Sequence, residues 1–271
     1  MTKVERTIEL VRHPLVFRLL QVGRVTRLTP RMKRVTLGGD QLAGFISAAP
    51  DDHVKLFFPP AGESKPALPS MGPRGLEFPE GQPRPENRDY TPRRYDAAAG
   101  ELDIDFVVHG DGPASTWASQ ATAGGSLGVA GPRGSFVVPD TFDWYLLTGD
   151  ETAIPAIGRR LQELRPGVRV FAFVEVADAT EEQEFKTATD LELVWLHRSD
   201  AKPGTTNLLE SAIRAFTFPP GDAYTWAAGE ASSMNAVRRH LLDDRGVNKD
   251  WMKVRGYWKR GVTDHQEPHS D

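Results

Sequence analysis

The 271-residue chain contains no cysteine. This absence excludes disulfide bonds, a thiolate nucleophile and an iron–sulfur cluster held by cysteine ligands. No apolar run approaches the roughly 20 residues that a membrane-spanning helix needs, so we expect no membrane insertion. Residues 1–6 carry charges with no apolar stretch behind them, which is unlike a secretory signal. We therefore expect a cytoplasmic protein.

The chain also lacks an excess of positive charge. Its 33 lysines and arginines stand against 37 acidic residues, a formal net charge of −4. A basic field that would bind nucleic acid is therefore not expected, and an anionic ligand must be met by a local group of basic residues. Composition, 39% hydrophobic and 26% charged, is typical of a globular protein. The length suits one large domain or two ordinary ones.

The N-terminal half reads as short antiparallel strands with turns between them. Nine prolines between Pro59 and Pro92 argue against regular structure there and predict a long surface loop. Strands of this number and length form a small six-stranded barrel. The predicted strands cover residues 15–28, 32–37, 53–58, 88–93, 101–108, 126–130 and 136–138.

From residue 140 onward, predicted strands alternate with predicted helices. This alternation is typical of a parallel sheet with helices on both faces. The tail, residues 265–271, contains two histidines that could bind a metal, although a frayed chain end is the simpler interpretation. Strands are predicted at 144–148, 168–176, 191–196, 224–228 and 251–257, and helices at 151–164, 180–185, 207–216 and 232–244.

The most informative stretch, NRDYTPRRY at residues 87–95, concentrates cations, aromatic rings and a hydroxyl. In a single extended strand, Arg88, Tyr90 and Pro92 would share one face, with the intervening residues on the other. Such groups could meet in turn the pyrophosphate, the ribityl chain and the isoalloxazine edge of a flavin dinucleotide. The alternative is a solvated, charged strand edge.

A second candidate site is the sequence GPAS at residues 112–115, which opens a predicted helix. Free backbone N–H groups and a hydroxyl at a helix start suit a pyrophosphate, although an ordinary helix cap explains them as well. His109, at the end of the preceding strand, could contact a flavin or face solvent.

Three loops of the C-terminal half follow strands, at residues 149–155, 227–234 and 256–261. Ligands of open parallel sheets bind beyond the carboxyl ends of strands, where all three loops lie. Each could also be only a tight turn, and the first is not the usual G-x-G-x-x-G sequence. Glu175, at the end of the second strand, would favour a ribose hydroxyl, whereas His197 and Arg198 could serve a 2′-phosphate.

Taken together, the chain resembles the siderophore-interacting proteins, NAD(P)H-dependent ferric-siderophore reductases within the ferredoxin-reductase-like flavoproteins. The resemblance covers nearly the whole chain, and its motifs are specific as a set although no single one is. They are HVKLFFP (53–59), RDYTPR (88–93), FVVHG (106–110), GPASTWA (112–118), GPRG (131–134), GDETAIPA (149–156), AGE (228–230) and GYWK (256–259).

The resemblance implies an FAD-binding antiparallel β-barrel over residues 1–139 and a Rossmann-like NAD(P)H-binding α/β domain over residues 140–271. It implies that electrons pass from NADPH, or from NADH, through FAD to a ferric siderophore, with release of Fe(II). The cofactor-binding residues that we expect are Arg88, Tyr90, Thr91, His109, Ala114, Ser115, Thr152, Ala153, Gly229, Glu230, Tyr257 and Trp258. A basic triad for the anionic substrate would consist of Lys55, Arg133 and Lys259.

No catalytic acid or base and no protein-bound metal is expected, because electron transfer to chelated iron needs only proximity to the flavin. Two alternatives stay open: a general flavin reductase or ferredoxin-type reductase, and a siderophore- or flavin-binding protein without turnover. The absence of cysteine sets the chain apart from ferric-siderophore reductases that carry an iron–sulfur centre. We expect a monomer.

Overall fold

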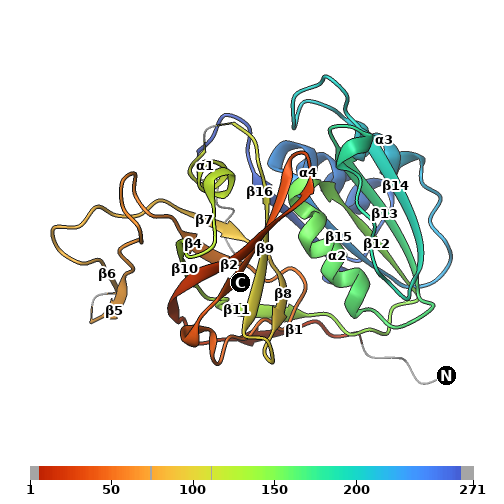
Figure 1. Cartoon of the computed structure of the whole chain (residues 1–271). Coiled ribbons are helices and arrows are strands. Elements are labelled where there is room, and N and C mark those ends of the chain that lie inside the picture. Colours follow the sequence, from red (N-terminus) through yellow and green to blue (C-terminus); the bar gives the residue numbers. More distant parts are fainter. Residues whose placement is uncertain (1–5, 74, 111, 264–271) are drawn as a thin grey trace. The chain divides into compact units, whose positions relative to one another are not determined.

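The computed structural model describes residues 6–73, 75–110 and 112–263 (Figure 1). The chain divides into two compact units, each with its own hydrophobic core. The N-terminal unit spans residues 9–137, and the C-terminal unit comprises residues 138–263 together with residues 6–8. The predicted tail with its two histidines lies outside the described residues.

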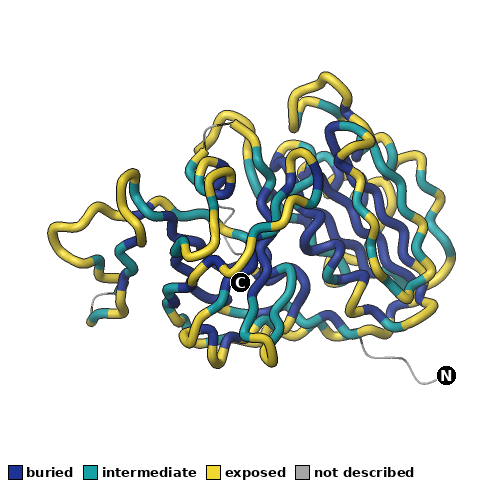
Figure 2. Tube along the Cα trace, viewed as in Figure 1, coloured by how far each residue is buried: buried dark blue, intermediate teal, exposed yellow. Residues whose placement is uncertain are grey.

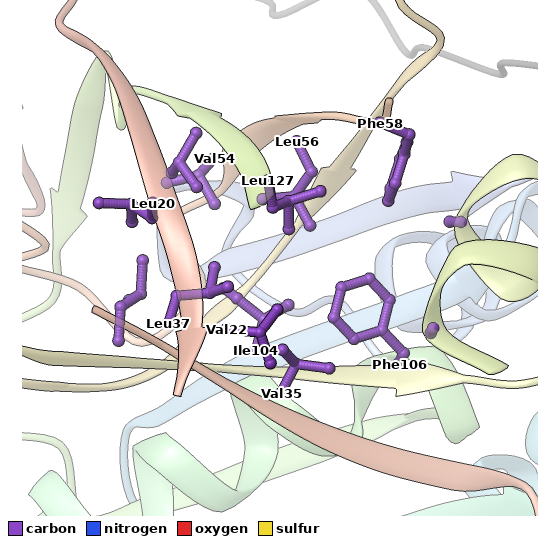
Figure 3. Close-up of a cluster of buried hydrophobic side chains, with 14 of the residues drawn as sticks. Leu20, Val22, Val35, Leu37, Val54, Leu56, Phe58, Ile104, Phe106 and Leu127 are labelled. Atoms are coloured by element: carbon purple, nitrogen blue, oxygen red, sulfur yellow. The ribbon is translucent and has the colours of Figure 1, made fainter. Parts of the chain in front are cut away.

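The N-terminal unit is built on a seven-stranded antiparallel sheet with the order β7–β4–β10–β2–β3–β9–β8. Alternate residues of its strands, such as Leu102, Ile104 and Phe106, are fully buried in the core (Figure 3). The strands are β2 (Phe17–Thr29), β3 (Met32–Gly38), β4 (Val54–Phe57), β7 (Asn87–Tyr90), β8 (Pro92–Asp96), β9 (Glu101–Val107) and β10 (Ser126–Ala130).

Smaller elements complete this unit. The first and last strands of this unit, β1 and β11, pair with each other, and the sequence predicted only the second of them. These elements are β1 (Glu9–Arg12), η1 (Asp40–Leu42), α1 (Pro113–Gln120) and β11 (Gly134–Val137).

The prediction of one strand over residues 88–93 is wrong. β7 ends at Tyr90 and pairs with β4, whereas β8 begins at Pro92 and pairs with β9, at the opposite edge of the sheet. A proline has no N–H for a ladder, and it restricts the residue before it, so the chain changes partner at Thr91. The predicted common face of Arg88 and Pro92 is lost, and the single strand predicted over residues 88–93 is divided between two strands, β7 and β8.

This one-residue joint accounts for the barrel. Seven strands spaced by ~4.8 Å would make a flat sheet roughly 29 Å wide, whereas one residue spans only ~3.5 Å. Since Thr91 alone connects the two edge strands, the sheet must curl until its edges approach each other. The predicted antiparallel barrel is therefore confirmed.

The proline-rich segment is not entirely irregular. It contains a short antiparallel hairpin, β5 (Ser70–Gly72) with β6 (Gly75–Glu77), which is mostly exposed (Figure 2). The segment also packs on the barrel, because a Cβ added to Gly128 of β10 would lie only 2.3 Å from the Cδ2 atom of Leu68. Glycine is therefore required at this position of the strand.

The C-terminal unit contains a five-stranded parallel sheet with the order β14–β13–β12–β15–β16 (Figure 1). Every residue of β12 is buried (Figure 2). The strands are β12 (Trp144–Asp150), β13 (Arg169–Val176), β14 (Asp190–His197), β15 (Ala223–Glu230) and β16 (Met252–Trp258). The helices are α2 (Ile154–Glu163), α3 (Leu208–Ala215) and α4 (Ala231–Arg239), with short turns η2 (Glu151–Ala153), η3 (Ala179–Glu181), η4 (His240–Asp244) and η5 (Lys249–Trp251).

Helices cover both faces of this sheet, as predicted. Leu209 of α3 and Met234 of α4 share a buried cluster with Trp144. On the opposite face, the Arg160 guanidinium of α2 lies 5.6 Å from the Tyr224 ring centroid. The predicted Rossmann-like arrangement is confirmed.

The helix predicted at residues 180–185 is wrong. Only the turn η3 forms there, because Asp178 accepts hydrogen bonds from the backbone N and the hydroxyl of Thr180 and closes a tight turn. The following segment is held instead by Thr187, whose hydroxyl donates to the Leu161 carbonyl of α2 at 2.6 Å. The connection from β13 to β14 therefore contains the turn η3 but no α-helix.

Candidate functional site

In the N-terminal unit, a row of aromatic rings brings the end of β7 next to α1. The Tyr90 ring centroid lies 4.6 Å from that of Phe106 on β9, which in turn lies 5.5 Å from that of Trp117 on α1. These contacts hold together two segments that the sequence marked separately as flavin-binding. The structure therefore brings the predicted strand residues and the predicted helix start into one region of this unit.

Tyr90 and Arg88 have distinct environments in this region. Burial raises the pKa of Tyr90, against the opposing influence of the Arg88 charge, so its phenol stays protonated as a hydrogen-bond donor. The Arg88 guanidinium donates to the Asn87 carbonyl at 2.6 Å and to the exposed Glu86 carboxylate at 3.3 Å. A pairing with an exposed carboxylate is weak, so a stronger anion could replace Glu86 beside Arg88.

The start of α1 carries no side-chain cap. Its N-cap residue is Gly112 and its first helical residue is Pro113, and no side chain bonds the first-turn N–H groups among the described residues. The Ser115 hydroxyl, predicted to suit a pyrophosphate, accepts the His109 backbone N–H at 2.7 Å and retains its own O–H as a donor. The hydroxyl therefore shapes the turn, and the backbone N–H groups provide the anion-binding potential.

The remaining predicted flavin residues differ in their accessibility. His109 is exposed, whereas Ala114 and Thr91 are 7% and 6% exposed. Most of Thr91 is thus covered by the protein, because it forms the corner between β7 and β8. Only a small part of that residue is open to a ligand.

In the C-terminal unit, three of the predicted loops converge on Asp150, at the end of β12. Its Oδ1 atom accepts the backbone N–H and the hydroxyl of Thr152, at 2.9 and 2.5 Å. Its Oδ2 atom accepts the backbone N–H of Glu230 at 2.9 Å and the indole N–H of Trp258 at 2.8 Å. Thr152, Glu230 and Trp258, predicted from three separate loops, are therefore held together by a residue outside the predicted set.

Asp150 is 6% exposed, and its surroundings disfavour the ionised form of its carboxyl group. Burial, together with the nearby Glu151 charge, raises the pKa of Asp150 to about 6, against the hydrogen bonds from Thr152 and Trp258. A signal for this residue was present in the sequence, since an aspartate followed two residues later by threonine is typical of a capped turn. Its partners on β15 and β16 could not be read from the sequence.

Gly229 and Glu230 complete this arrangement. A Cβ added to Gly229, which has a φ of +156°, would lie 2.7 Å from the Asp150 Oδ2 atom. The Glu230 carboxylate accepts the backbone N–H groups of Ser232 and Ser233 at the start of α4, at 2.7 and 3.0 Å. The chain's own carboxylates therefore bind backbone N–H groups in two of the loops where the sequence suggested ligand binding.

Two further predicted residues of these loops are apolar or aromatic. Ala153 is fully buried, and the Tyr257 ring lies 6.3 Å from that of Trp226. Ala153 follows Thr152 and Tyr257 precedes Trp258 in the sequence, so both lie at the carboxyl edge of the sheet.

A cavity of about 260 Å³ opens within the C-terminal unit beyond the end of β13. Its walls combine carboxylates, hydroxyl groups, an amide and one guanidinium group. The lining residues are Glu175, Gly204, Thr205, Thr206, Asn207, Leu209, Glu210, Ser232, Ser233, Ala236 and Arg260. This composition suits a polar ligand that carries hydroxyl groups.

The two cations suggested for a 2′-phosphate are both paired with carboxylates. Arg198 is buried and donates two hydrogen bonds to Glu151, at 2.8 and 2.5 Å. The His197 ring bonds Glu182 at 2.7 Å. Neither residue lines the cavity.

The three predicted substrate-binding residues come from both units. Lys55 of β4 donates to Asp89 of β7 at 2.8 Å, so part of its charge is compensated. Arg133 and Lys259 are exposed, the former just before β11 and the latter just after β16.

Within residues 6–73, 75–110 and 112–263, no group of three or more histidine or acidic side chains could hold a metal ion. No helix in that same part of the chain is long and apolar enough to cross a membrane.

Comparison with known proteins gives matches over both units. The model of the siderophore-interacting FAD-binding domain matches residues 21–136, and that of the siderophore-interacting protein matches residues 142–261. The NADPH-dependent ferric-chelate reductase of Escherichia coli K12 is 36% identical over 262 residues, 95% of this chain and 99% of that protein.

Two further relatives support the same grouping. The ferric vibriobactin reductase ViuB of Vibrio cholerae is 34% identical over 260 residues, 93% of this chain and 94% of that protein. The crystal structure of a siderophore utilization protein from T. fusca superimposes with a TM-score of 0.87 at 47% identity, covering 97% of this chain and 99% of that one.

Proposed function

We propose, from the fact that this chain belongs to the siderophore-interacting protein family, that it is a flavin-dependent ferric-siderophore reductase. The observation that carries the proposal is the full-length match to a ferric-chelate reductase, at 36% identity. A second full-length relative is named as a reductase of a ferric siderophore. The reaction would take electrons from NADPH or NADH and release iron as Fe(II).

The N-terminal unit fits FAD. The uncapped start of α1 offers N–H groups to a pyrophosphate, and the Tyr90 phenol and the Arg88 guanidinium lie in the same region. When bound, FAD accepts a hydride from the nicotinamide and returns the electrons singly to an acceptor. We propose that Arg88, Tyr90, Thr91, His109, Ala114 and Ser115 hold it, with Ser115 acting through the turn that it fixes.

The nicotinamide donor would bind at the carboxyl edge of the parallel sheet. Thr152, Ala153, Gly229, Glu230, Tyr257 and Trp258 remain our predictions for the residues that border it. Since backbone N–H groups of this edge already donate to Asp150 and Glu230, we expect these residues to act mainly by shape and by fixing the loops.

Lys55, Arg133 and Lys259 remain our prediction for the residues that attract the anionic ferric siderophore. The iron is here the substrate, held by its chelator, and needs no ligand from the protein. Because Lys55 is paired with Asp89 at 2.8 Å, we expect its removal alone to have a smaller effect than that of Lys259. A cytoplasmic location and a monomeric state also remain predictions.

The test is an anaerobic assay on the purified protein. Bound flavin should absorb in the visible and bleach on addition of NADPH or NADH, and a panel of ferric siderophores should then yield Fe(II), read with a chelating dye. A protein that binds flavin but is not bleached would be a carrier. One that reduces free flavin but releases no Fe(II) from any siderophore would be a general flavin reductase, and either result would refute the proposal.

A further inference from the structure

The cavity beyond β13 contains a buried carboxylate with unused capacity for hydrogen bonds. Glu175 is 5% exposed, and within the described part of the chain one side chain bonds it, the Thr206 hydroxyl at 2.7 Å. A carboxylate can accept about four hydrogen bonds. Burial raises the pKa of Glu175, against the Thr206 hydrogen bond and the Arg198 charge. Hydroxyl donors from a ligand would therefore stabilise this group.

The surroundings of Glu175 are acidic. At the same edge of the sheet, Asp150 and Glu230 are also buried carboxylates, 6% and 3% exposed. Arg198, whose charge acts on Glu175, is already engaged by both oxygens of Glu151. A dianionic group that entered the cavity beside Glu175 would be repelled by its charge.

One feature of the cavity opposes this repulsion. Arg260 is the one positively charged residue among the described residues that line the cavity, and it is exposed. Its backbone N–H donates to Glu230, at 3.2 Å. Arg260 could therefore attract a phosphate, but a single exposed guanidinium is a weaker influence than a buried carboxylate.

We propose that this cavity binds the adenosine ribose of the nicotinamide donor and that Glu175, by accepting the 2′-hydroxyl, lets the enzyme use NADH as well as NADPH. The inference rests on the proposed function, since it assigns a donor-specificity residue to that reaction. An acid at the end of the second strand of such a sheet is suited to a ribose hydroxyl. A 2′-phosphate at the same place gains Arg260 but meets the Glu175 charge.

The test compares Glu175→Gln with a matched control, Glu210→Gln. Glu210 lines the same cavity, but its carboxylate is paired with Arg214 on the same helix at 2.9 Å. Calorimetry on the flavin-loaded protein would measure binding of 5′-AMP and of 2′,5′-ADP, which differ by the 2′-phosphate. Glu175→Gln should tighten 2′,5′-ADP by about tenfold or more relative to 5′-AMP, and Glu210→Gln should change this ratio by less than about twofold.

The kinetic readout is the ratio of kcat/KM for NADH to that for NADPH, with ferricyanide as acceptor. In the wild-type protein this ratio should be at least about 0.1, and Glu175→Gln should lower it about tenfold or more. Glu175→Asp, which keeps the charge, should retain most of the wild-type ratio and serves if the glutamine variant does not fold.

Three results would overturn the inference. They are a wild-type preference for NADPH above about tenfold, an effect of Glu175→Gln no larger than that of Glu210→Gln, and a fall of the NADH-to-NADPH ratio in Glu175→Asp as large as in Glu175→Gln. If neither donor reduces the flavin, the proposed function fails instead, while the binding of the two adenosine phosphates still tests the role of Glu175.

Discussion

Replacing Asp150 with asparagine should change how the stability of the protein depends on pH. Each oxygen of this buried carboxylate accepts two hydrogen bonds, from Thr152, Glu230 and Trp258. An asparagine has one acceptor oxygen, and its NH₂ group would face two donors. The substitution therefore breaks an arrangement in which three loops depend on one ionised side chain.

The size of the effect follows from the pKa of Asp150. Burial and the Glu151 charge raise it from 3.8 to about 6. An acid whose pKa is raised on folding contributes stability below its unfolded pKa, and this contribution is lost as the pH rises through the folded pKa. A shift of this size corresponds to about 3 kcal/mol. The wild-type protein should therefore lose about 3 kcal/mol relative to Asp150→Asn between about pH 4 and pH 7.

The assay is urea unfolding, followed by tryptophan fluorescence, at a series of pH values. Asp178→Asn is the matched control, because Asp178 accepts the backbone N–H and the hydroxyl of Thr180 at 2.8 and 2.5 Å, as Asp150 does with Thr152. If the difference between wild type and Asp150→Asn stays constant with pH, or if Asp178→Asn shows the same drift, the reasoning about burial is refuted.

Three other variants, two of them double substitutions, test the remaining sites. Arg88→Ala with Tyr90→Ala should weaken flavin binding, since loss of one charge-assisted bond costs about 1.5–3 kcal/mol; full flavin occupancy after purification would place the site elsewhere. Lys55→Ala with Lys259→Ala should raise KM for an anionic ferric siderophore, most at low salt, with flavin content unchanged, and an unaltered KM there would remove both residues from the substrate site. Gly229→Ala should destabilise the protein by about 1–3 kcal/mol in thermal unfolding, because its Cβ would meet a carboxylate; an unchanged Tm would contradict the close approach.

Much of the fold could be predicted because it depends on local periodicity. The alternation at Leu102, Ile104 and Phe106 placed these side chains in the barrel core, where all three are fully buried. The buried strands and amphipathic helices after residue 140 likewise specified a parallel sheet. The change of partner at Thr91 could not be predicted, since it depends on which distant strands compete for the two halves of the segment.

The candidate sites were predictable only in part, for a related reason. The loops that contain Thr152, Glu230 and Trp258 could be recognised one at a time from their positions after strands. That a single carboxylate joins them, with Trp258 separated from it by 108 positions, is a property of the folded chain. The same holds for Arg198. From the sequence it could serve a 2′-phosphate, but in the structure its guanidinium is paired with Glu151.

The joint at Thr91 also bears on how the N-terminal unit behaves toward other copies of itself. Because one stretch of chain supplies both outer strands of the barrel sheet, these strands are only four and five residues long. Short outer strands offer little backbone for a second molecule to extend, which is one way in which β proteins avoid association edge to edge. Substitutions made between Arg88 and Pro92 to weaken flavin binding therefore also alter the outer strands that limit association between molecules. Sedimentation of each variant would distinguish weaker flavin binding from aggregation.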